Sequence, residues 1–520
     1  MLRTSRTARL ALTALSLTAI ACGAPPPVST PPLTTASPSP SVAAVKSATG
    51  DPTPTTPTPV APPYGTDADL GAWTDAYVSS FGKSWGEAYA FSGYIAVTRD
   101  GKPIYARAYG KANRESGAVA DADTRFRIGS ITKQFTATCV MQLAEKGKLE
   151  VDDPLRKYLP DYPKSGDKVT LHHLLTHTSG IPSFTDDEAL MKVRGTRHTQ
   201  AEVLATFKDK PLEFEPGERF AYSNSGYFLL GLVIEKVSGQ SYEAYLQEHV
   251  LGPAGMKRSS TIDAEDAPNT AVGYDNDDDD KIERAHGVDM SLPFSAGALR
   301  STASDLFAWD RALAGNLLLT DAAKQRMYSP EKDNYAYGWV VWTEDGRKIA
   351  GHDGGIDGFA SSYRRIPEER LVLVALANHG FELGKIMKPL TTMLLTGKKA
   401  EPPAERAEVP MDGRVVARAA GEYALSVASK KMIEGKVPAT TLDSIKTIAI
   451  KADKGKLFLK PAKQERVRLY LGEAALLFAK KAGVEITLDG DQKGMATGFA
   501  LKQGGLALSY ERVKPFIKTR

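Results

Sequence analysis

Strand-like and helical patterns of apolar residues alternate along this chain. A helix is predicted over 67–80, and the apolar runs 94–97 and 104–107 then flank Asp100-Gly101, which is typical of a β-hairpin with a tight turn. The long segment that follows favours helices and loops. Strand-like runs return near its end, at 337–342, 348–351, 360–364 and 371–377.

Strands at both ends of one region, separated by a helical insert, predict the fold class. We expect an α/β (α+β) domain over 67–396, in which helices flank an antiparallel sheet and the insert forms a helical lobe. The space between the sheet and the lobe is a natural position for a ligand site.

A second pattern begins beyond residue 395. A short charged linker that contains proline, 397–411, precedes a region of alternating short strands, 412–520, which predicts a small all-β domain that is barrel-like or sandwich-like. Its strand-like runs are 421–423, 456–460, 467–471, 475–479, 484–488 and 506–510. None of them has a catalytic pattern, so we expect the chemistry in the first domain.

The composition is that of an ordinary globular protein with few cysteines. Of 520 residues, 42% are hydrophobic, and 66 Lys and Arg against 62 Asp and Glu leave a net charge of +4, which predicts no nucleic-acid partner. The two cysteines, Cys22 and Cys139, are too few for a disulfide framework. Cys139 falls on the apolar side of a predicted helix, where we expect a small core residue.

The N-terminus predicts export. Arg3, Arg6 and Arg9 precede an apolar stretch, 10–21, that is too short to span a bilayer, and Cys22 follows it. Residues 1–22 form a signal peptide of the lipoprotein type in this interpretation, because the residues before the cysteine resemble the lipobox of bacterial lipoproteins. The resemblance implies that Cys22 carries a lipid. Ordinary secretion with cleavage nearby is the alternative.

The segment 23–66 is rich in Pro, Thr and Ser, and such a composition cannot bury enough apolar surface to fold. We expect a disordered linker that holds the folded domains away from an anchor. The protein is therefore expected in the bacterial cell envelope, lipid-anchored to a membrane on the periplasmic side or at the cell surface. Its oligomeric state does not follow from the sequence.

The motif Ser130-Ile131-Thr132-Lys133 lies where a strand pattern gives way to a helical one. On a helix, a serine and a lysine three residues apart share one face. A serine hydroxyl becomes a nucleophile when a base takes its proton, and a lysine can be that base when its surroundings lower its pKa. We therefore predict Ser130 as nucleophile and Lys133 as base, with a simple N-cap role for Ser130 as the alternative.

A second motif, Tyr222-Ser223-Asn224, lies between a predicted turn and a predicted buried helix. A tyrosine beside lysines loses its proton more easily and can relay a proton between nucleophile and leaving group. An asparagine amide can orient the lysine and contact the substrate. The alternative is that this tyrosine is a core residue.

A third motif, His352-Asp353-Gly354, lies in a strand-like stretch and is followed by Gly355. Glycines in a strand allow a substrate to approach the backbone closely, so we expect His352 and Gly354 to contact substrate. The backbone amides of Gly355 and Ser130 are expected to form an oxyanion hole. A glycine-rich turn with a structural histidine is the alternative.

The patterns S-x-x-K, Y-x-N and H-x-G, in this order, resemble the serine β-lactamase and penicillin-binding-protein family. The resemblance is closer to the class C β-lactamase-like branch, which includes D-alanyl-D-alanine carboxypeptidases, D-amino-acid peptidases and esterases. The stretches 174–182 and 297–306 are similar to phrases of that branch. The resemblance implies a β-lactamase/transpeptidase-like fold, an acyl-enzyme on Ser130, Lys133 as base, Tyr222 as proton shuttle and Asn224 as a contact of lysine and substrate.

One motif departs from the branch. True class C β-lactamases have K-T-G as the third motif, whereas this chain has His352-Asp353-Gly354. A neutral histidine binds a substrate carboxylate more weakly than a lysine. We therefore expect hydrolysis of small esters or of peptides that contain a D-amino acid, such as fragments of peptidoglycan, and we expect no metal ion or other cofactor.

Two alternatives to this function stay open. One is a true β-lactamase. The other is a catalytically idle protein that binds cell-wall peptides or a protein partner, although a matched nucleophile and base argue against it.

Two further clusters receive a structural interpretation. His172, His173 and His177 lack the H-E-x-x-H spacing of a zinc site, so we interpret them as structural histidines. The acidic run 275–280 has Asp280 at the position where a calcium loop needs glycine. We therefore expect that run to be a solvated loop.

Overall fold

The computed structural model describes residues 62–262, 267–403, 405–434, 437, 439–462, 466–480, 483–490, 494–503 and 506–515. The predicted signal peptide, Cys22 and most of the predicted linker lie outside the described residues. Among the helices of the described ranges, none combines the length and the apolar character needed to cross a bilayer.

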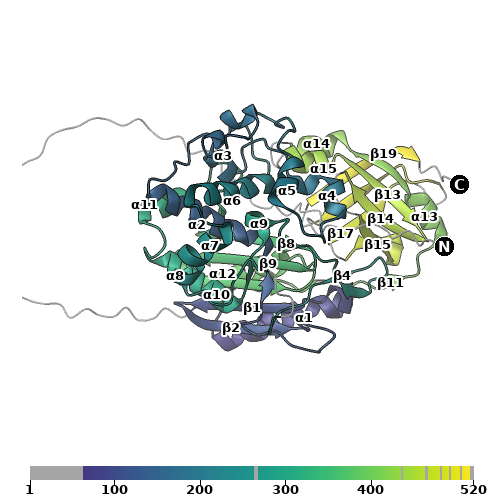
Figure 1. Cartoon of the computed structure of the whole chain (residues 1–520). Helices are drawn as coiled ribbons and strands as arrows, with labels where there is room; N and C mark the ends of the chain where they lie inside the picture. Colours follow the sequence, from purple (N-terminus) through teal and green to yellow (C-terminus); the bar gives the residue numbers. More distant parts are fainter. Residues whose placement is uncertain are drawn as a thin grey trace, which may run out of the picture.

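A six-stranded antiparallel sheet is the centre of the larger domain within the described ranges (Figure 1), with the strand order β2-β1-β10-β9-β8-β7. The first strands of the domain, β1 and β2, join its last strands through the pairing of β1 with β10. The prediction that both ends of the domain build one sheet is therefore confirmed. The strands are β1 (Gly93–Arg99), β2 (Lys102–Tyr109), β7 (Val340–Glu344), β8 (Arg347–Ile356), β9 (Phe359–Ile366) and β10 (Leu371–Ala377).

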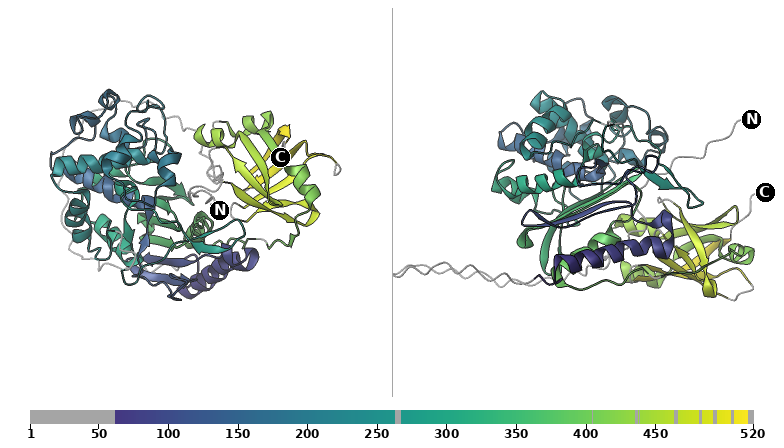
Figure 2. Two further views of the ribbon diagram at one scale, coloured as in Figure 1. Left: turned by 45° about the vertical axis from the view of Figure 1, so that its right-hand side comes forward. Right: turned by 90° about the horizontal axis from the view of Figure 1, so that it is seen from below.

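Helices cover both faces of this sheet (Figure 2). On one face lie α1 (Asp67–Trp85) and α12 (Gly384–Thr396), and on the other lies the helical lobe, with α2 (Thr132–Glu145) and α6 (Asn224–Ser238). Strand β1 shows why the sheet needs both layers. Ile95 packs in the apolar cluster of α1 and α12, whereas its neighbour Ala96 packs in that of the lobe, so the strand is buried on both sides.

The rest of this domain consists of short elements, most of them in the helical insert. Two ribbons, β3 (Phe126–Arg127) with β6 (Arg300–Ser301) and β4 (Tyr274–Asn276) with β5 (Ile282–Arg284), accompany the helices. The helices are η2 (Glu87–Tyr89), η3 (Gly129–Ile131), η4 (Leu155–Lys157), η5 (Lys164–Asp167), α3 (Leu171–Leu175), η6 (Phe184–Asp186), α4 (Glu188–Lys192), α5 (Gln200–Ala205), α7 (Tyr242–Leu246), η7 (Gln247–Leu251), α8 (Gly252–Ala254), α9 (Phe294–Gly297), α10 (Ala303–Ala314), α11 (Asp321–Met327) and η8 (Pro367–Glu369). Cys139 is fully buried on α2, as predicted.

The C-terminal domain is a barrel, which confirms the barrel-like prediction and excludes the sandwich. In the described residues eight strands follow one another, and the pairing of β15 with β16 closes the ring. They are β12 (Gly421–Leu425), β13 (Thr447–Asp453), β14 (Lys456–Pro461), β15 (Val467–Gly472), β16 (Leu477–Ala479), β17 (Val484–Leu488), β18 (Gly498–Gln503) and β19 (Leu506–Pro515). Side chains such as Ile450, Leu459 and Phe499 are fully buried and form its packed core.

Other elements accompany the barrel, and β13 and β18 were not among the predicted strands. The two-residue strand β11 (Glu408–Val409) pairs with β15. The short helices are α13 (Gly413–Ala419), α14 (Val427–Ile433), α15 (Ala439–Ile445) and η9 (Glu473–Ala475). The barrel lies to one side of the larger domain in Figures 1 and 2.

Candidate active site

Ser130 lies in η3, two residues before α2 begins. Its neighbours Gly129 and Ile131 are buried, whereas Ser130 itself is half-buried and therefore accessible to a small substrate. The residue at the N-cap of α2 is Ile131, and the turn that contains Ser130 has no side-chain cap. The N-cap alternative for Ser130 is therefore wrong, and its hydroxyl is free for another contact.

The side chain of Lys133 is fully buried, and its amine contacts three oxygens. The nitrogen lies 3.1 Å from Ser130 Oγ, 2.8 Å from Asn224 Oδ1 and 2.8 Å from the backbone oxygen of Ala296. Burial lowers the pKa of Lys133 well below its ordinary value of 10.5, because the charged form loses its hydration.

The three contacts of Lys133 give a defined direction to its neutral form, which burial favours. A neutral amine has two N–H bonds and one lone pair, and carbonyl oxygens can only accept hydrogen bonds. The oxygens of Asn224 and Ala296 take both N–H bonds. In this neutral form the lone pair faces Ser130 Oγ, the third oxygen within hydrogen-bond distance of the amine. This is the geometry of a base that is ready to take a proton.

Asn224 begins α6 and is oriented by the lobe. Its backbone N–H donates to Ser183 Oγ at 3.0 Å, and its side-chain nitrogen lies 3.3 Å from Thr185 Oγ1. These contacts turn its carbonyl oxygen toward Lys133. The structure therefore places Asn224 against the lysine as predicted, whereas the supporting residues Ser183 and Thr185, like the carbonyl of Ala296, had no motif that identified them.

Tyr222 lies beside the same amine, with Lys133 Nζ 4.8 Å from the centre of its ring. Its hydroxyl is buried and, among the described residues, has no hydrogen-bond partner of regular geometry. Burial raises the pKa of Tyr222 above 10, and the nearby Ser130 hydroxyl opposes this shift. The sequence argument that lysines would ease loss of the phenol proton is wrong here, because burial of the phenol disfavours its charged form. Tyr222 holds its proton and can donate it.

His352 lies on β8 with both ring nitrogens engaged inside the protein. Nε2 lies 3.0 Å from the hydroxyl of Tyr335, and Nδ1 lies 2.6 Å from the backbone oxygen of Asp353. Burial and the nearby Lys133 lower the pKa of His352 to about 4, so the ring is neutral at physiological pH. The structure brings His352 to the site, but as a buried wall whose nitrogens already have partners.

The glycines after His352 bring β8 against the turn that carries Ser130. A Cβ at Gly354 would lie 2.0 Å from the backbone oxygen of Ile128, so the close approach that Gly354 permits is to this carbonyl. A Cβ at Gly129 would lie 3.0 Å from the backbone nitrogen of Gly355. The predicted oxyanion amides, of Gly355 and Ser130, thus belong to two backbone segments in direct contact.

His177 is the site residue that the sequence interpretation missed. Its ring centre lies 4.1 Å from that of Tyr222 and 4.5 Å from that of Tyr335, and Nδ1 accepts a hydrogen bond from the Ser223 N–H at 3.1 Å. Burial, then Lys133, lowers the pKa of His177, so this ring is neutral as well. The stretch 174–182, which carries part of the family resemblance, contains His177 and was the available signal.

The other two histidines of that cluster have structural partners, as predicted. His173 Nδ1 accepts the N–H of Thr170 at the start of α3, and His172 Nδ1 lies 2.7 Å from the Tyr337 hydroxyl. In the part of the chain that the structure describes, no group of three or more His, Cys, Asp or Glu is arranged to hold a metal ion.

The turn between β8 and β9 is held by a buried ion pair. Asp357 Oδ2 lies 2.6 Å from Arg194 of the helical lobe, and both side chains are almost fully buried. Because Asp357 follows Gly355 by two residues, this pair ties the lobe to the strand that carries the predicted oxyanion amide. No sequence pattern indicated it.

Comparisons with known proteins show what this chain is similar to. The family model described as Beta-lactamase matches residues 74–391. The chain is 28% identical over 431 residues to penicillin-binding protein 4* of Bacillus subtilis (strain 168). The aligned region covers 77% of this chain and 90% of that protein.

Solved structures are also similar. The octameric penicillin-binding protein homologue of Pyrococcus abyssi is 26% identical, with a TM-score of 0.57 over 84% of this chain and 99% of the other. The D-stereospecific amidohydrolase of Streptomyces sp. is 27% identical, with a TM-score of 0.53 over 63% of this chain and 99% of the other. The first similarity extends past the larger domain, since it covers more of this chain than the family model does.

Proposed function

The chain belongs to the beta-lactamase family of serine hydrolases, and on that premise we propose that it cleaves small esters or D-amino-acid-containing peptides through an acyl-enzyme on Ser130. The observation that carries this proposal is the fully buried amine of Lys133, whose pKa burial lowers well below 10.5 and whose nitrogen lies 3.1 Å from the hydroxyl oxygen of half-buried Ser130. A protein that only binds peptides has no use for such a pair, which argues against the idle alternative.

The proposed reaction assigns one role to each side chain. Ser130 Oγ attacks the substrate carbonyl carbon as its proton passes to Lys133 Nζ, and the amides of Ser130 and Gly355 stabilise the negative carbonyl oxygen. The bond to the leaving group then breaks. Tyr222 donates its proton to the leaving nitrogen or oxygen and regains one from Lys133. Attack by water releases the acid and frees Ser130.

The surroundings of His352 support substrates without a free carboxylate at this position. Both of its ring nitrogens have partners within the protein, and its low pKa keeps it uncharged. A K-T-G lysine would supply a cation here, and this histidine does not. Esters and amides therefore fit the site better than substrates that end in a carboxylate. A relative named as a D-stereospecific amidohydrolase supports the D-amino-acid class.

A labelling experiment tests the proposal. We expect a fluorescent fluorophosphonate to modify the wild-type protein and to leave the Ser130→Ala variant unlabelled. A panel of p-nitrophenyl esters, D-amino-acid amides, D-alanyl-D-alanine peptides and nitrocefin then separates the candidate classes. Preferred turnover of nitrocefin would favour the true β-lactamase, and a wild-type protein that neither labels nor turns over any substrate would favour the idle binder.

We also propose that the protein is exported and lipid-anchored through Cys22. The support is the charged and apolar start of the chain and the cysteine that follows it. Membrane fractionation in a bacterial host tests this. The wild-type protein is expected in the membrane fraction and a Cys22→Ser variant in the soluble secreted fraction, whereas an unchanged distribution would contradict the anchor.

A further inference from the structure

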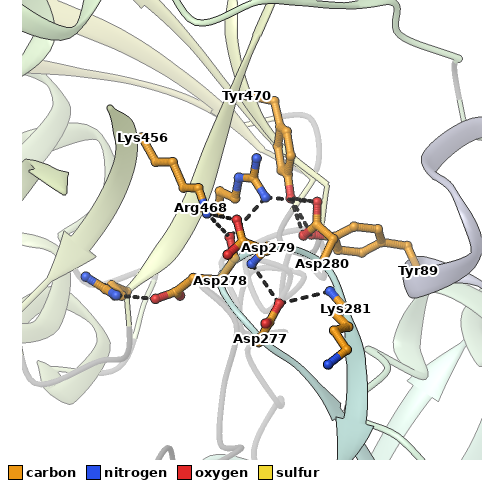
Figure 3. A network of polar contacts seen from close by, with 10 residues as sticks. Tyr89, Asp277, Asp278, Asp279, Asp280, Lys281, Lys456, Arg468 and Tyr470 are labelled. Carbon is orange, nitrogen blue, oxygen red and sulfur yellow. Dashed lines mark hydrogen bonds and ion pairs between the residues drawn. The ribbon is translucent and has the colours of Figure 1, made fainter. Parts of the chain in front are cut away.

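The hairpin of β4 and β5 ends in an acidic tip that contacts the barrel (Figure 3). Lys456 pairs with Asp279, Arg466 pairs with Asp278, and Arg468 pairs with Asp280 at 3.1 Å. The sequence predicts a solvated loop here, and that prediction is wrong for Asp278 and Asp280, whose side chains are about 30% and 24% exposed.

Two tyrosines complete the contact around Asp280. The Tyr89 hydroxyl, from the turn after α1, donates to Asp280 Oδ1 at 2.7 Å, and the Tyr470 hydroxyl, from β15, donates to Oδ2 at 2.7 Å. The two hydroxyls are themselves 2.7 Å apart. The main chain of the tip is also bound, because Arg468 and Lys456 each donate to the backbone oxygen of Asp278 at 3.0 Å. Several charged hydrogen bonds on one short loop hold it more firmly than isolated surface pairs do.

The other end of the same hairpin packs on the turn between β8 and β9. A Cβ at Gly358 would lie 2.6 Å from the Ala285 Cβ and 2.8 Å from the carbonyl carbon of Gly273. A Cβ at Gly273 would in turn lie 2.6 Å from the ring of Phe359. Gly273 and Ala285 are the residues just outside β4 and β5, so the base of the hairpin and this turn are in contact without a gap.

The hairpin thus connects the barrel to the predicted oxyanion strand. Its strands are three residues long, which corresponds to roughly 10 Å at the usual rise per residue. Gly358 is three residues from Gly355, whose amide lies against the Gly129 turn beside Ser130. A short, packed hairpin passes a displacement from one end to the other when both of its ends are held. Both ends of this hairpin are held, so its position follows that of the barrel.

We propose that the barrel is a positioning element for catalysis: Asp278 and Asp280, through their contacts with Arg466, Arg468 and Tyr470, hold the β4–β5 hairpin against the Gly358 turn and so fix the Gly355 amide. These are positioning residues, because they touch neither substrate nor reacting atoms. The inference rests on the proposed acylation of Ser130 for its kinetic consequence, but its structural consequence is independent of any substrate.

The test compares a double variant, which carries both Asp278→Asn and Asp280→Asn, with a matched control. Both substitutions are isosteric. Lys281→Met is the control, because Lys281 lies on the same hairpin. Within the described part of the chain, its amine forms an ion pair only with the exposed Glu283. A second variant, Arg468→Met, breaks the contact from the barrel side and covers the case in which the double variant does not fold.

Two measurements are made on the full-length protein. Hydrogen–deuterium exchange of the amides at 355–359 is expected to rise in both contact variants and to stay at the wild-type level in the control. The rate constant at saturation for phosphonylation of Ser130 by the fluorophosphonate, which releases fluoride, is expected to fall by about tenfold. The concentration for half-maximal rate should stay within about twofold of wild type, because a displaced oxyanion donor weakens the transition state and not the ground state.

Exchange that rises only in the hairpin and the barrel, with 355–359 unchanged, would overturn the inference, as would an unchanged acylation rate in variants whose tip has loosened. The exchange result is decisive even if the wild-type protein shows no hydrolase activity. Failure of the proposed function and failure of the barrel's positioning role can therefore be told apart.

Discussion

The side-chain oxygen of Asn224 lies 2.8 Å from the amine of Lys133, and this contact determines where the lone pair of the amine points. With Ala296 accepting the second N–H, the remaining direction is that of Ser130. Burial favours the neutral form of the lysine, and the two acceptors that orient its amine carry no charge. The base is therefore prepared before substrate arrives, at no cost of reorganisation during the reaction.

Replacing Asn224 with Asp should remove this preparation. A carboxylate 2.8 Å from the amine favours the ammonium form, so the pKa of Lys133 rises and the fraction of free base at neutral pH falls. We expect the acylation rate at pH 7 to fall by about 100-fold, which is the lower range of a lost general base. Fluorophosphonate labelling across pH measures it.

The pH profile distinguishes this mechanism from simple damage to the site. In Asn224→Asp the rise of the acylation rate with pH should move to higher pH and recover much of the loss in alkaline buffer. The Asn224→Ala control removes the contact without adding charge, so its rate should be low at all pH values with little displacement of the profile. Equal displacement in both variants would contradict the argument.

Stability should also depend on pH through His352. Its pKa is about 4 in the folded protein, against an ordinary value of 6.5. Between these values the unfolded chain binds more protons than the folded one, so the free energy of unfolding rises with pH. The contribution of buried, neutral His352 to the free energy of unfolding is fully present above pH 6.5 and is lost as the pH falls toward 4.

A His352→Gln variant tests this dependence, since glutamine keeps a hydrogen bond for Tyr335 but does not titrate. Urea unfolding at pH 5 and pH 8 should show a smaller loss of stability at pH 5 in the variant than in the wild-type protein. His177, whose pKa is also lowered, is present in both proteins and cancels from the comparison. Identical losses would mean that His352 is not buried in its neutral form.

The three motifs and the sheet could be predicted from the sequence because each depends on local spacing. Ser130 and Lys133 share a helix face, and the apolar runs of β1 and β8–β10 have the length and flanking turns of strands. The direction of each functional group could not be predicted in the same way. Whether Tyr222 gains or loses proton affinity depends on burial by distant segments, and the sequence argument chose the wrong sign.

Contacts between remote segments account for the other omissions. His177 and Tyr335 meet only when the lobe folds onto the segment just before β7, and Arg194 meets Asp357 across 163 positions of sequence. Likewise, the acidic run at 275–280 has the composition of a solvated loop, and only the folded barrel supplies its basic partners. Composition indicates that such residues are polar, not which partner neutralises them.

Adding one methyl group at Gly354 should disrupt the site. In Gly354→Ala the new Cβ would lie 2.0 Å from the backbone oxygen of Ile128 and 2.4 Å from Ser361 Oγ, and the first of these atoms cannot rotate away. We expect destabilisation of about 1–3 kcal/mol, the usual cost of overpacking, together with at least a tenfold loss of acylation because β8 is pushed from the Ser130 turn.

Gly384→Ala is the matched control for this substitution. Gly384 is the first residue of α12, and a Cβ there would meet nothing within 4 Å. Urea unfolding and fluorophosphonate labelling of the control should match the wild-type values or improve on them. Wild-type stability and labelling in Gly354→Ala would contradict the close approach of β8 to the Ile128 carbonyl.

The ion pair of Arg194 and Asp357 leads to the last prediction. Either single variant, Arg194→Met or Asp357→Leu, removes one charge of a pair whose side chains are at most 4% exposed and leaves the opposite charge buried. Each should lower the free energy of unfolding by about 3–5 kcal/mol, whereas loss of an exposed pair such as Lys168–Glu215 should cost about 1 kcal/mol or less. Urea unfolding measures both.

The double variant Arg194→Met with Asp357→Leu separates charge burial from lost packing. If unpaired charge causes the damage, the double variant should be more stable than either single variant, because no buried charge remains. Its acylation rate should nevertheless stay below that of the wild-type protein, since the turn after Gly355 has lost its tie to the lobe. A double variant that is less stable than both single variants would show that the pair contributes shape rather than charge compensation.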